Sequence, residues 1–246
     1  MKKDNPKILV TICNYNHEKY LKESIASIQN QSYDNLDICV YDDGSENKEK
    51  IIEIVNEASK KDKRIRFLNE KENKGKWFGL NKAIQTTEAL ICTSHDADDI
   101  SLENRIERQV TVLSLTNTYH NLCGFHHCFS EDDVKKYNKK QANISSQIDC
   151  ISKEDVYNFV MNGFTHPDIN HYYTGNFETA GTTAMFYKQL WDFGLRFNPP
   201  SLGLRTILSE DSDFNFRATC MFNSTSVLAE KLYLYRRNTS TNREEK

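Results

Sequence analysis

The N-terminal half of the chain alternates between short apolar runs and longer amphipathic stretches. In the stretch at 18–30, apolar side chains recur at helical spacing, at Leu21, Ile25 and Ile28, which places them on one helical face. The apolar runs are short and rich in β-branched residues, as strands are. The pattern predicts strands at 7–13, 36–41, 64–68 and 89–94, and helices at 18–30, 46–60, 77–86 and 102–115.

Apolar strands that are separated by helices of this length indicate βαβ units. We therefore predict an α/β fold with a mostly parallel central sheet flanked by helices. Ligands of such sheets bind beyond the carboxyl ends of the strands. Polar residues follow three of these ends, at 14–16, 42–43 and 96–99, so we expect them to converge in space.

The second half of the chain is less regular. The pattern there predicts a strand at 119–130, a polar hairpin tip or mobile loop at 131–146, a helix at 152–162 capped by Ser152, a strand at 183–187, a helix starting at 210 and capped by Ser209, and a strand at 227–235. Residues 163–180 are rich in His, Tyr, Asn and Gly, a composition typical of a binding loop. Because no repeat or clean linker interrupts the chain, we predict a single domain over residues 1–246.

Composition limits the classes of protein that fit. The chain has 246 residues and a formal net charge of −3, so charge gives no argument for nucleic-acid binding. No apolar stretch approaches the ~20 residues needed to span a bilayer, and the N-terminus lacks the apolar core of a signal peptide. We therefore expect a soluble, cytoplasmic protein.

The seven cysteines are scattered singly along the chain. Their odd number and the lack of a C-x-x-C pair argue against a disulfide framework or a structural zinc site. Cys13, Cys39 and Cys92 lie in apolar runs and are predicted to be small core residues. Cys123 and Cys128 flank two histidines, but their spacing matches no common zinc pattern.

Acidic clusters at two strand ends give the best lead to chemistry. The sequence DADD at 96–99 ends one apolar run, and DDGS at 42–45 ends another. Carboxylates spaced D-x-D can hold a hard divalent cation that keeps coordination sites open for substrate phosphates. Each cluster also has a plain alternative, because 42–45 is a favourable turn sequence and 96–99 could cap the next helix. Together the clusters indicate one crevice for a phosphorylated substrate.

In order and spacing, the motifs resemble those of the family 2 glycosyltransferases with the GT-A fold. The segments that carry the resemblance are ILVTICNYN at 8–16, YDDGS at 41–45, NKGK at 73–76, DADD at 96–99 and ED at 210–211. The likeness covers residues 7–236. It implies transfer of a sugar from a nucleotide diphosphate to an acceptor hydroxyl, usually with inversion at the anomeric carbon and with Mg²⁺ or Mn²⁺. It also implies a nucleotide-sugar-binding half at 7–118 and an acceptor-binding and catalytic-base half at 119–236.

The resemblance implies a nucleoside site at the ends of the first two strands. Asp43 matches the acid that accepts a hydrogen bond from the N3–H of uracil or thymine, which favours a UDP- or dTDP-sugar as the donor. The other matching positions are Thr11, Asn14 and Tyr15 around the nucleoside, and Asn73 and Lys76 near the base and ribose.

The resemblance also implies residues for the diphosphate and the donor sugar. Asp98 matches the metal-binding acid of D-x-D, while Asp96 and Ala97 match positions nearer the ribose or donor sugar. Arg236 belongs to a late aromatic–Arg pair, where a cation could approach the diphosphate.

The reaction itself is implied to depend on the start of the late helix. Asp211 matches the catalytic base and Glu210 its companion. Standing alone, these acids would be explained by the helix dipole, which favours negative charge at a helix N-terminus. A general base at this position would take the proton of the acceptor hydroxyl as that hydroxyl attacks.

The implied enzyme is a hexosyl- or N-acetylhexosaminyl-transferase. Its acceptor would be a glycan or a lipid-linked oligosaccharide in surface polysaccharide or glycoconjugate biosynthesis, with no nucleic acid as a partner. A lipid-linked acceptor would require contact with the membrane face, which the lysines at 135–140 could supply. The chain departs from the family pattern at 195–209, which are irregular, and in having no histidine clearly placed as a further metal ligand.

Two other functions fit parts of the sequence. A nucleotidyltransferase also combines metal-binding acids with an α/β sheet, but it normally has a Gly-rich phosphate loop after the first strand, where this chain reads NYNHE. A catalytically inactive nucleotide-sugar-binding module would bind a donor without transferring or hydrolysing it. The acids at 98 and 211 argue for an active enzyme.

Overall fold

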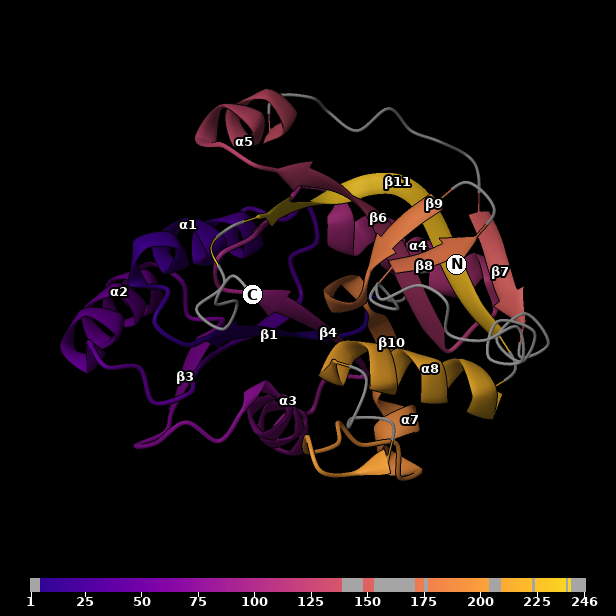
Figure 1. The fold of residues 1–246 in the computed structure, drawn as a ribbon, viewed down its shortest axis with the longest axis horizontal. Coiled ribbons are helices and arrows are strands. Elements are labelled where there is room, and N and C mark those ends of the chain that lie inside the picture. The colour runs from indigo at the N-terminus through magenta and orange to yellow at the C-terminus, as the bar shows by residue number, and fades with distance from the viewer. Residues whose placement is uncertain are drawn as a thin grey trace.

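The structure is a computed structural model. It describes residues 5–138, 148–152, 171–174, 177–203, 209–222, 224–237 and 239. Within these residues, eleven strands form one large sheet with helices packed on both of its faces (Figure 1). The main path through the sheet runs β3-β2-β1-β4-β10-β6-β11-β5.

The strands are β1 (Ile8–Asn14), β2 (Leu36–Asp42), β3 (Ile65–Asn69), β4 (Ile91–Asp96), β5 (Ile100–Ser101), β6 (His120–Cys128), β7 (Ile148–Ser152), β8 (His171–Thr174), β9 (Phe177–Ala180), β10 (Met185–Tyr187) and β11 (Ser224–Arg236). The helices are α1 (Glu18–Gln29), α2 (Lys48–Lys61), α3 (Lys76–Gln85), α4 (Arg105–Thr116), α5 (Glu131–Asn138), the 3₁₀ turn η1 (Gly181–Thr183), α7 (Lys188–Asp192) and α8 (Glu210–Phe222).

The first half of the chain forms the parallel part of the sheet. β1 pairs in parallel with β2 and with β4, and β2 pairs in parallel with β3. The register sets Asn14 opposite Asp42 and Cys13 opposite Asp96, so the polar strand ends meet at one edge. The elements predicted for this half are confirmed, each with ends that differ by no more than three residues.

The second half extends the sheet with mixed pairing. β10 runs antiparallel to both β4 and β6, and it therefore joins the two halves. β6 and β11 pair in parallel, while β5 and β7 each pair antiparallel to β11. The predicted strand at 119–130 and the predicted strand at 227–235 are confirmed as β6 and β11.

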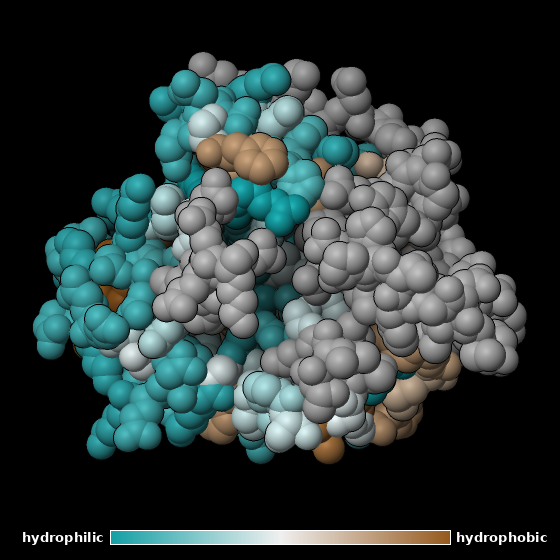
Figure 2. All heavy atoms as spheres, viewed as in Figure 1, coloured by the Kyte–Doolittle hydropathy of each residue, from teal (hydrophilic) through white to brown (hydrophobic). Residues whose placement is uncertain are grey.

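Two apolar layers hold the helices to the sheet. Alternate residues of β1 divide between them, with Ile8 and Val10 facing one layer and Leu9 facing the other, as period-two alternation requires. The first layer includes apolar side chains from α1, α2 and α4, and the second includes side chains from α3, α7 and α8. The outward surface over α1 and α2 is mostly hydrophilic (Figure 2). α3 and α8 therefore share one face of the sheet, and Lys76 and Asp211 in their first turns contact each other.

Two predictions for the second half need correction, and a third lies mostly outside the described residues. Residues 131–138 form helix α5, and not a loop, because Ser130 and Asp133 cap each other: the Asp133 N–H donates to Ser130 Oγ at 3.2 Å and the Ser130 N–H donates to Asp133 Oδ2 at 3.1 Å. Ser152 is the last residue of strand β7, and the helix predicted to follow it, 153–162, lies outside the described residues. Thr183 belongs to η1, and the strand that follows begins at Met185.

The segment predicted to be a binding loop is partly described. Residues 171–174 and 177–180 form the antiparallel pair β8–β9, and the rest of 163–180 lies outside the described residues. The lysines at 139 and 140 lie outside them as well. In the described part of the chain, no helix is both long and apolar enough to cross a bilayer.

Among the cysteines whose side chains the structure describes, four are buried in strands, and two of them, Cys39 and Cys92, confirm the prediction of small core residues. Cys39, Cys92, Cys123 and Cys128 are buried, and Cys13 is partly exposed at the end of β1. Burial raises the pKa of the Cys39 thiol to about 12, so this side chain is neutral at physiological pH. Among the described residues, no group of three His, Cys, Asp or Glu is arranged to hold a metal ion by itself.

Gly79 of α3 allows the ring of Tyr41 to pack against the helix. A Cβ at Gly79 would lie 2.1 Å from Tyr41 Cδ1, and Tyr41 is fully buried. We expect Gly79→Ala to lower the free energy of unfolding by about 1–3 kcal/mol, because overpacking outweighs the better helix propensity of alanine. Urea unfolding measures the change. Gln85→Ala, at an exposed position of the same helix, is the control, and a Gly79→Ala protein at least as stable as wild type would contradict the prediction.

Candidate active site

Five segments of the chain meet at the carboxyl edge of the parallel strands. The ends of β1, β2 and β4 supply Asn14, Asp43 and Asp96, and the N-termini of α3 and α8 supply Lys76 and Asp211. The sequence-predicted acids are therefore brought together, as the topology requires. The contacts among them differ in several places from those that the sequence predicts.

The end of β1 is fixed to the end of β2 by buried hydrogen bonds. Asn14 Nδ2 donates to Asp42 Oδ1 at 2.6 Å and to Ser45 Oγ at 3.1 Å. The Ser45 N–H donates to Asp42 Oδ2 at 3.1 Å. Asn14 and Asp42 are buried, so their role in this structure is to hold the first two strand ends in register.

Asp43 anchors the loop that precedes α3. Its carboxylate accepts hydrogen bonds from the Lys74 N–H at 2.8 Å, the Gly75 N–H at 2.9 Å and the Tyr41 hydroxyl at 2.8 Å. Gly44 makes this close approach possible, because a Cβ there would lie 2.6 Å from the carbonyl carbon of Glu72 and its φ is +75°. The sequence predicts a base-recognising acid here, and the anchoring role is an addition that the structure reveals.

Lys76 stands between the acids of the two halves. Its Nζ lies 2.7 Å from Asp96 Oδ1 and 2.9 Å from Asp211 Oδ2, and its side chain is 18% exposed. Burial would lower the pKa of Lys76, but Asp211 and Asp96 raise it well above its usual value. The same ammonium group outweighs burial at Asp96 and holds the pKa of that carboxyl below its usual value. The sequence predicts Lys76 near the base and ribose, and it does not predict this bridge.

Asp211 is held at the start of α8. The Ser212 N–H donates to Ser209 Oγ at 3.3 Å, which confirms Ser209 as the helix cap. Gly181 packs against Asp211, since a Cβ on Gly181 would lie 2.9 Å from Asp211 Cβ. Burial raises the pKa of Asp211 to about 6, with Lys76 acting against the rise and Glu210 adding to it. A carboxyl with this pKa is mostly ionised at pH 7 and can accept a proton close to neutrality.

Asp98 is the acid best placed to bind a metal. Its side chain is 15% exposed, its Oδ2 accepts a hydrogen bond from the Thr239 hydroxyl, and His17 Nε2 lies 4.0 Å from the same oxygen. Asp96 is instead paired with Lys76. This donor set fits a hard cation that takes one carboxylate from the protein and fills its other positions with phosphate oxygens and water.

Asp99 has a structural role. It is fully buried, and its Oδ1 accepts a hydrogen bond from the Arg236 N–H at 2.8 Å. Burial raises the pKa of Asp99 well above its usual value, and the neighbouring Asp98 and Asp96 add to the rise.

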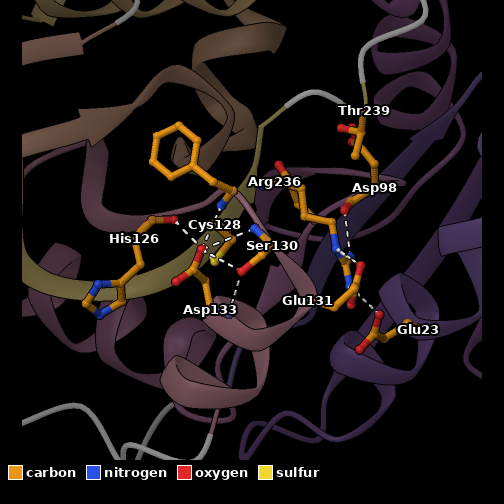
Figure 3. A network of polar contacts seen from close by, with 11 residues as sticks. Glu23, Asp98, His126, Cys128, Ser130, Glu131, Asp133, Arg236 and Thr239 are labelled. Carbon is orange, nitrogen blue, oxygen red and sulfur yellow. Dashed lines mark hydrogen bonds and ion pairs between the residues drawn. The ribbon is translucent and has the colours of Figure 1, made fainter.

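Arg236 is engaged by acids of two helices. Its guanidinium lies between Asp98, Glu23 and Glu131 (Figure 3). It donates to the Asp98 carbonyl at 2.7 Å, hydrogen-bonds to Glu23, and has its Nε 3.4 Å from Glu131 Oε1. The sequence predicts Arg236 beside the diphosphate, whereas in this structure its charge is compensated by these two carboxylates.

The remaining predicted residues are either buried in the core or at least partly exposed near the candidate site. Thr11 is buried in the middle of β1, and Ala97 is fully buried with its N–H donated to the Cys13 carbonyl at 3.1 Å. Tyr15 is partly exposed just beyond β1, and Asn73 is exposed in the loop before α3. Glu210 is partly exposed beside Asp211 in the first turn of α8.

A sheet with a parallel first half, D-x-D acids at a strand end and a late helix that begins with acids facing them defines a nucleotide-sugar transferase fold of the GT-A type. The sequence profile described as Glycosyl transferase family 2 matches residues 9–191, and the chain therefore belongs to this family.

Curated relatives are also named as glycosyltransferases. An uncharacterized glycosyltransferase of Methanocaldococcus jannaschii is 41% identical over 107 residues, and one of Haemophilus influenzae is 41% identical over 108 residues. These matches cover 43% and 44% of this chain and 37% and 33% of the relatives, so the chain aligns with about a third of the length of each protein.

Solved structures share the fold over nearly the whole chain. TarS of S. aureus, residues 1–349, in complex with UDP-GlcNAc superposes with a TM-score of 0.66 at 17% identity, covering 95% of this chain and 59% of TarS. The mannosyltransferase PcManGT of Pyrobaculum calidifontis, in complex with GDP-Man and Mn²⁺, gives a TM-score of 0.64 at 16% identity and covers 98% of this chain and 59% of that protein. At these identities the likeness shows a common fold.

We expect Asp43→Asn to destabilise the protein even without nucleotide. The NH₂ group of asparagine would face one of the two backbone N–H donors, which leaves a partly buried donor unsatisfied and costs about 1 kcal/mol or more. Urea unfolding at pH 7 measures the loss, with Asp132→Asn at an exposed position as the control. Equal stability of Asp43→Asn and the control would show that the carboxylate does not anchor the loop.

Proposed function

We propose that this chain is the catalytic part of a metal-dependent glycosyltransferase. It would move a sugar from a UDP-sugar, or a dTDP-sugar, to a hydroxyl of a glycan or lipid-linked acceptor, with inversion. The observation that carries the proposal is the Lys76 bridge, since one side chain lies within 2.9 Å of both the proposed donor-side acid Asp96 and the proposed base Asp211. Donor and acceptor groups would thus react within one small space.

On the donor side, the proposal rests on the acids at the end of β4. Asp98 would hold Mn²⁺ or Mg²⁺, and such a cation would neutralise the charge that develops on the departing nucleotide diphosphate. Asp96, ionised beside Lys76, would accept hydrogen bonds from hydroxyls of the ribose or donor sugar. The structure of PcManGT in complex with GDP-Man and Mn²⁺ supports a metal in a protein of this fold.

On the acceptor side, Asp211 would act as the general base. The acceptor oxygen forms a bond to the anomeric carbon, the bond from that carbon to the diphosphate oxygen breaks, and the acceptor proton passes to Asp211. Because the attacking and leaving oxygens lie on opposite faces of the sugar, this displacement inverts the anomeric centre. A pKa of about 6 for Asp211 suits a base that works near neutral pH.

The proposal for the nucleobase rests on Asp43. An ionised carboxylate offers roughly four lone-pair positions. Three hydrogen bonds from Tyr41, Lys74 and Gly75 use most of this capacity, which leaves room for the single N3–H of a uracil or thymine. The TarS complex with UDP-GlcNAc supports uracil, while the GDP-Man complex of PcManGT shows that a guanine nucleotide also has to be tested.

The acceptor and the cellular role are proposed more broadly. We propose residues 7–118 for the donor and 119–236 for the acceptor and base, in an enzyme of surface polysaccharide or glycoconjugate biosynthesis in the cytoplasm. A lipid-linked acceptor would bring α5 near a membrane surface, where Lys135 and Lys136 lie on the same helix as Asp132 and Asp133. Such mixed charge supports at most weak attraction to anionic lipid.

A thermal-shift panel of UDP, dTDP, GDP and CMP, each with Mn²⁺ or with EDTA, tests the donor site. We expect UDP or dTDP to raise the melting temperature with Mn²⁺ and to have little effect with EDTA, because binding to the native state stabilises it. Asp98→Asn should lose the metal-dependent part of the shift, while Asp132→Asn should keep it. A larger shift with GDP would reject the Asp43 assignment, and no shift with any nucleotide would favour an inactive module.

Replacement of the proposed base tests the chemistry. We expect Asp211→Asn to bind the donor nucleotide as well as wild type does, and to lose transfer activity by roughly 10²–10⁴-fold, the usual contribution of general-base catalysis. Product formation at pH 7.5 is measured with the donor identified by the thermal-shift panel, and Asp192→Asn, at an exposed position, is the control. Near wild-type transfer by Asp211→Asn would remove Asp211 from the mechanism.

A further inference from the structure

The side chain of Lys76 has a role that the proposed function does not assign. We propose that Lys76 is a positioning residue: before any substrate arrives, it holds the Asp211 carboxylate in place as an anion that faces the crevice. The inference rests on the proposed function only in taking Asp211 as the base. It concerns the enzyme before substrate binds.

Geometry fixes the ammonium group from both ends. At the backbone end, Lys76 is the first residue of α3 and follows Gly75, whose φ of +93° turns the chain into the helix. Asp43 holds the backbone N–H groups of Lys74 and Gly75, so the start of α3 cannot shift freely. At its tip, Nζ contacts Asp96 and Asp211 at 2.7 and 2.9 Å. The ammonium group of Lys76 is therefore held in one position, between the carboxylates of Asp96 and Asp211.

The groups around Asp211 explain why a cation is required at that point. Four titratable groups face it from four elements: Lys76 of α3, Glu210 of α8, Asp96 of β4 and Cys13 of β1. Burial keeps the Cys13 thiol neutral by raising its pKa well above the usual value. Burial, Glu210 and Asp96 all favour the protonated form of Asp211. Among these groups in the described part of the chain, Lys76 alone favours the anion.

A merely structural salt bridge would have a different signature. If Lys76 only stabilised the fold, its removal would reduce activity to a similar extent at every pH. If it contacted the donor directly, the loss would also persist at high pH. A positioning role predicts instead that activity returns once the pH is high enough to ionise Asp211 without its help. The pH dependence therefore separates these roles.

The first test is the pH profile of kcat/KM, which reports ionisations of the free enzyme. We expect the acid limb of wild type to have its midpoint near 6, the pKa of Asp211. Lys76→Met should raise this midpoint by at least about one pH unit, so that activity falls about tenfold on the acid limb and largely recovers above pH 9. Lys76→Arg should restore most of the activity at neutral pH.

Lys82→Met is the matched control. Lys82 lies on the same helix and contacts Glu70, which also has Lys74 as a partner at 2.8 Å. Its removal should leave the acid limb unmoved. A loss of equal size at all pH values in Lys76→Met, or an acid limb at the wild-type position, would overturn the inference. If Lys76→Met does not fold, Lys76→Gln removes the charge and keeps a hydrogen-bond donor.

The second test requires no substrate. The ¹³C carboxyl resonance of Asp211, identified by its loss in Asp211→Asn, is titrated by NMR in the substrate-free protein. We expect a midpoint near 6 in wild type and a clearly higher midpoint in Lys76→Met. An unchanged midpoint would overturn the inference whether or not the protein transfers sugar. Conversely, a wild-type protein that titrates as expected but transfers no sugar would refute the proposed function and leave the role of Lys76 standing.

Discussion

The hydrogen bonds that the backbone N–H groups of Lys74 and Gly75 donate to the Asp43 carboxylate determine the geometry of the candidate site. They fix where α3 begins, and the first residue of α3 is the lysine that contacts the acids of both halves. Tyr41 supports the same carboxylate from the strand below, and its ring fills the space left by Gly79. A strand end, a loop and a helix start are thus joined by one buried acid. The electrostatics around Asp211 depend on that local arrangement.

Much of the first half of the fold follows from side-chain periodicity. Ile8 and Val10 face one apolar layer and Leu9 faces the other. Consecutive apolar residues in β1 therefore indicate a strand that is covered on both faces of the sheet. The second half carries weaker local signals. β10 has only three residues, Met185–Tyr187, and its antiparallel pairing with β4 and β6 has no periodicity long enough to reveal it. Helix α5 has one buried apolar residue, Val134, and its start is marked by the capping pair Ser130 and Asp133, which a polarity argument overlooks.

The candidate site was predictable in its residue types but not in its contacts. Acids at strand ends can be read from the sequence because parallel topology brings those ends to one edge. Lys76 and Asp211, however, are 135 residues apart, and only the packing of α3 beside α8 on one face brings them together. Arg236, at the end of β11, likewise contacts Glu23 of α1 across 213 residues of sequence. Such pairings are properties of the folded chain, and no short motif encodes them.

The match to the family profile ends at residue 191, before helix α8 begins. The strands and acids proposed for the donor lie within the matched region, whereas Asp211 lies beyond it. Lys76 therefore connects a part of the chain that follows the family pattern to a part outside the matched region. Any exchange of the C-terminal segment between relatives, in evolution or by engineering, would have to preserve an acid at the point that this lysine reaches. The contacts of Lys76 with Asp96 and Asp211 thus limit which C-terminal segments can be combined with this N-terminal part in a chimeric enzyme.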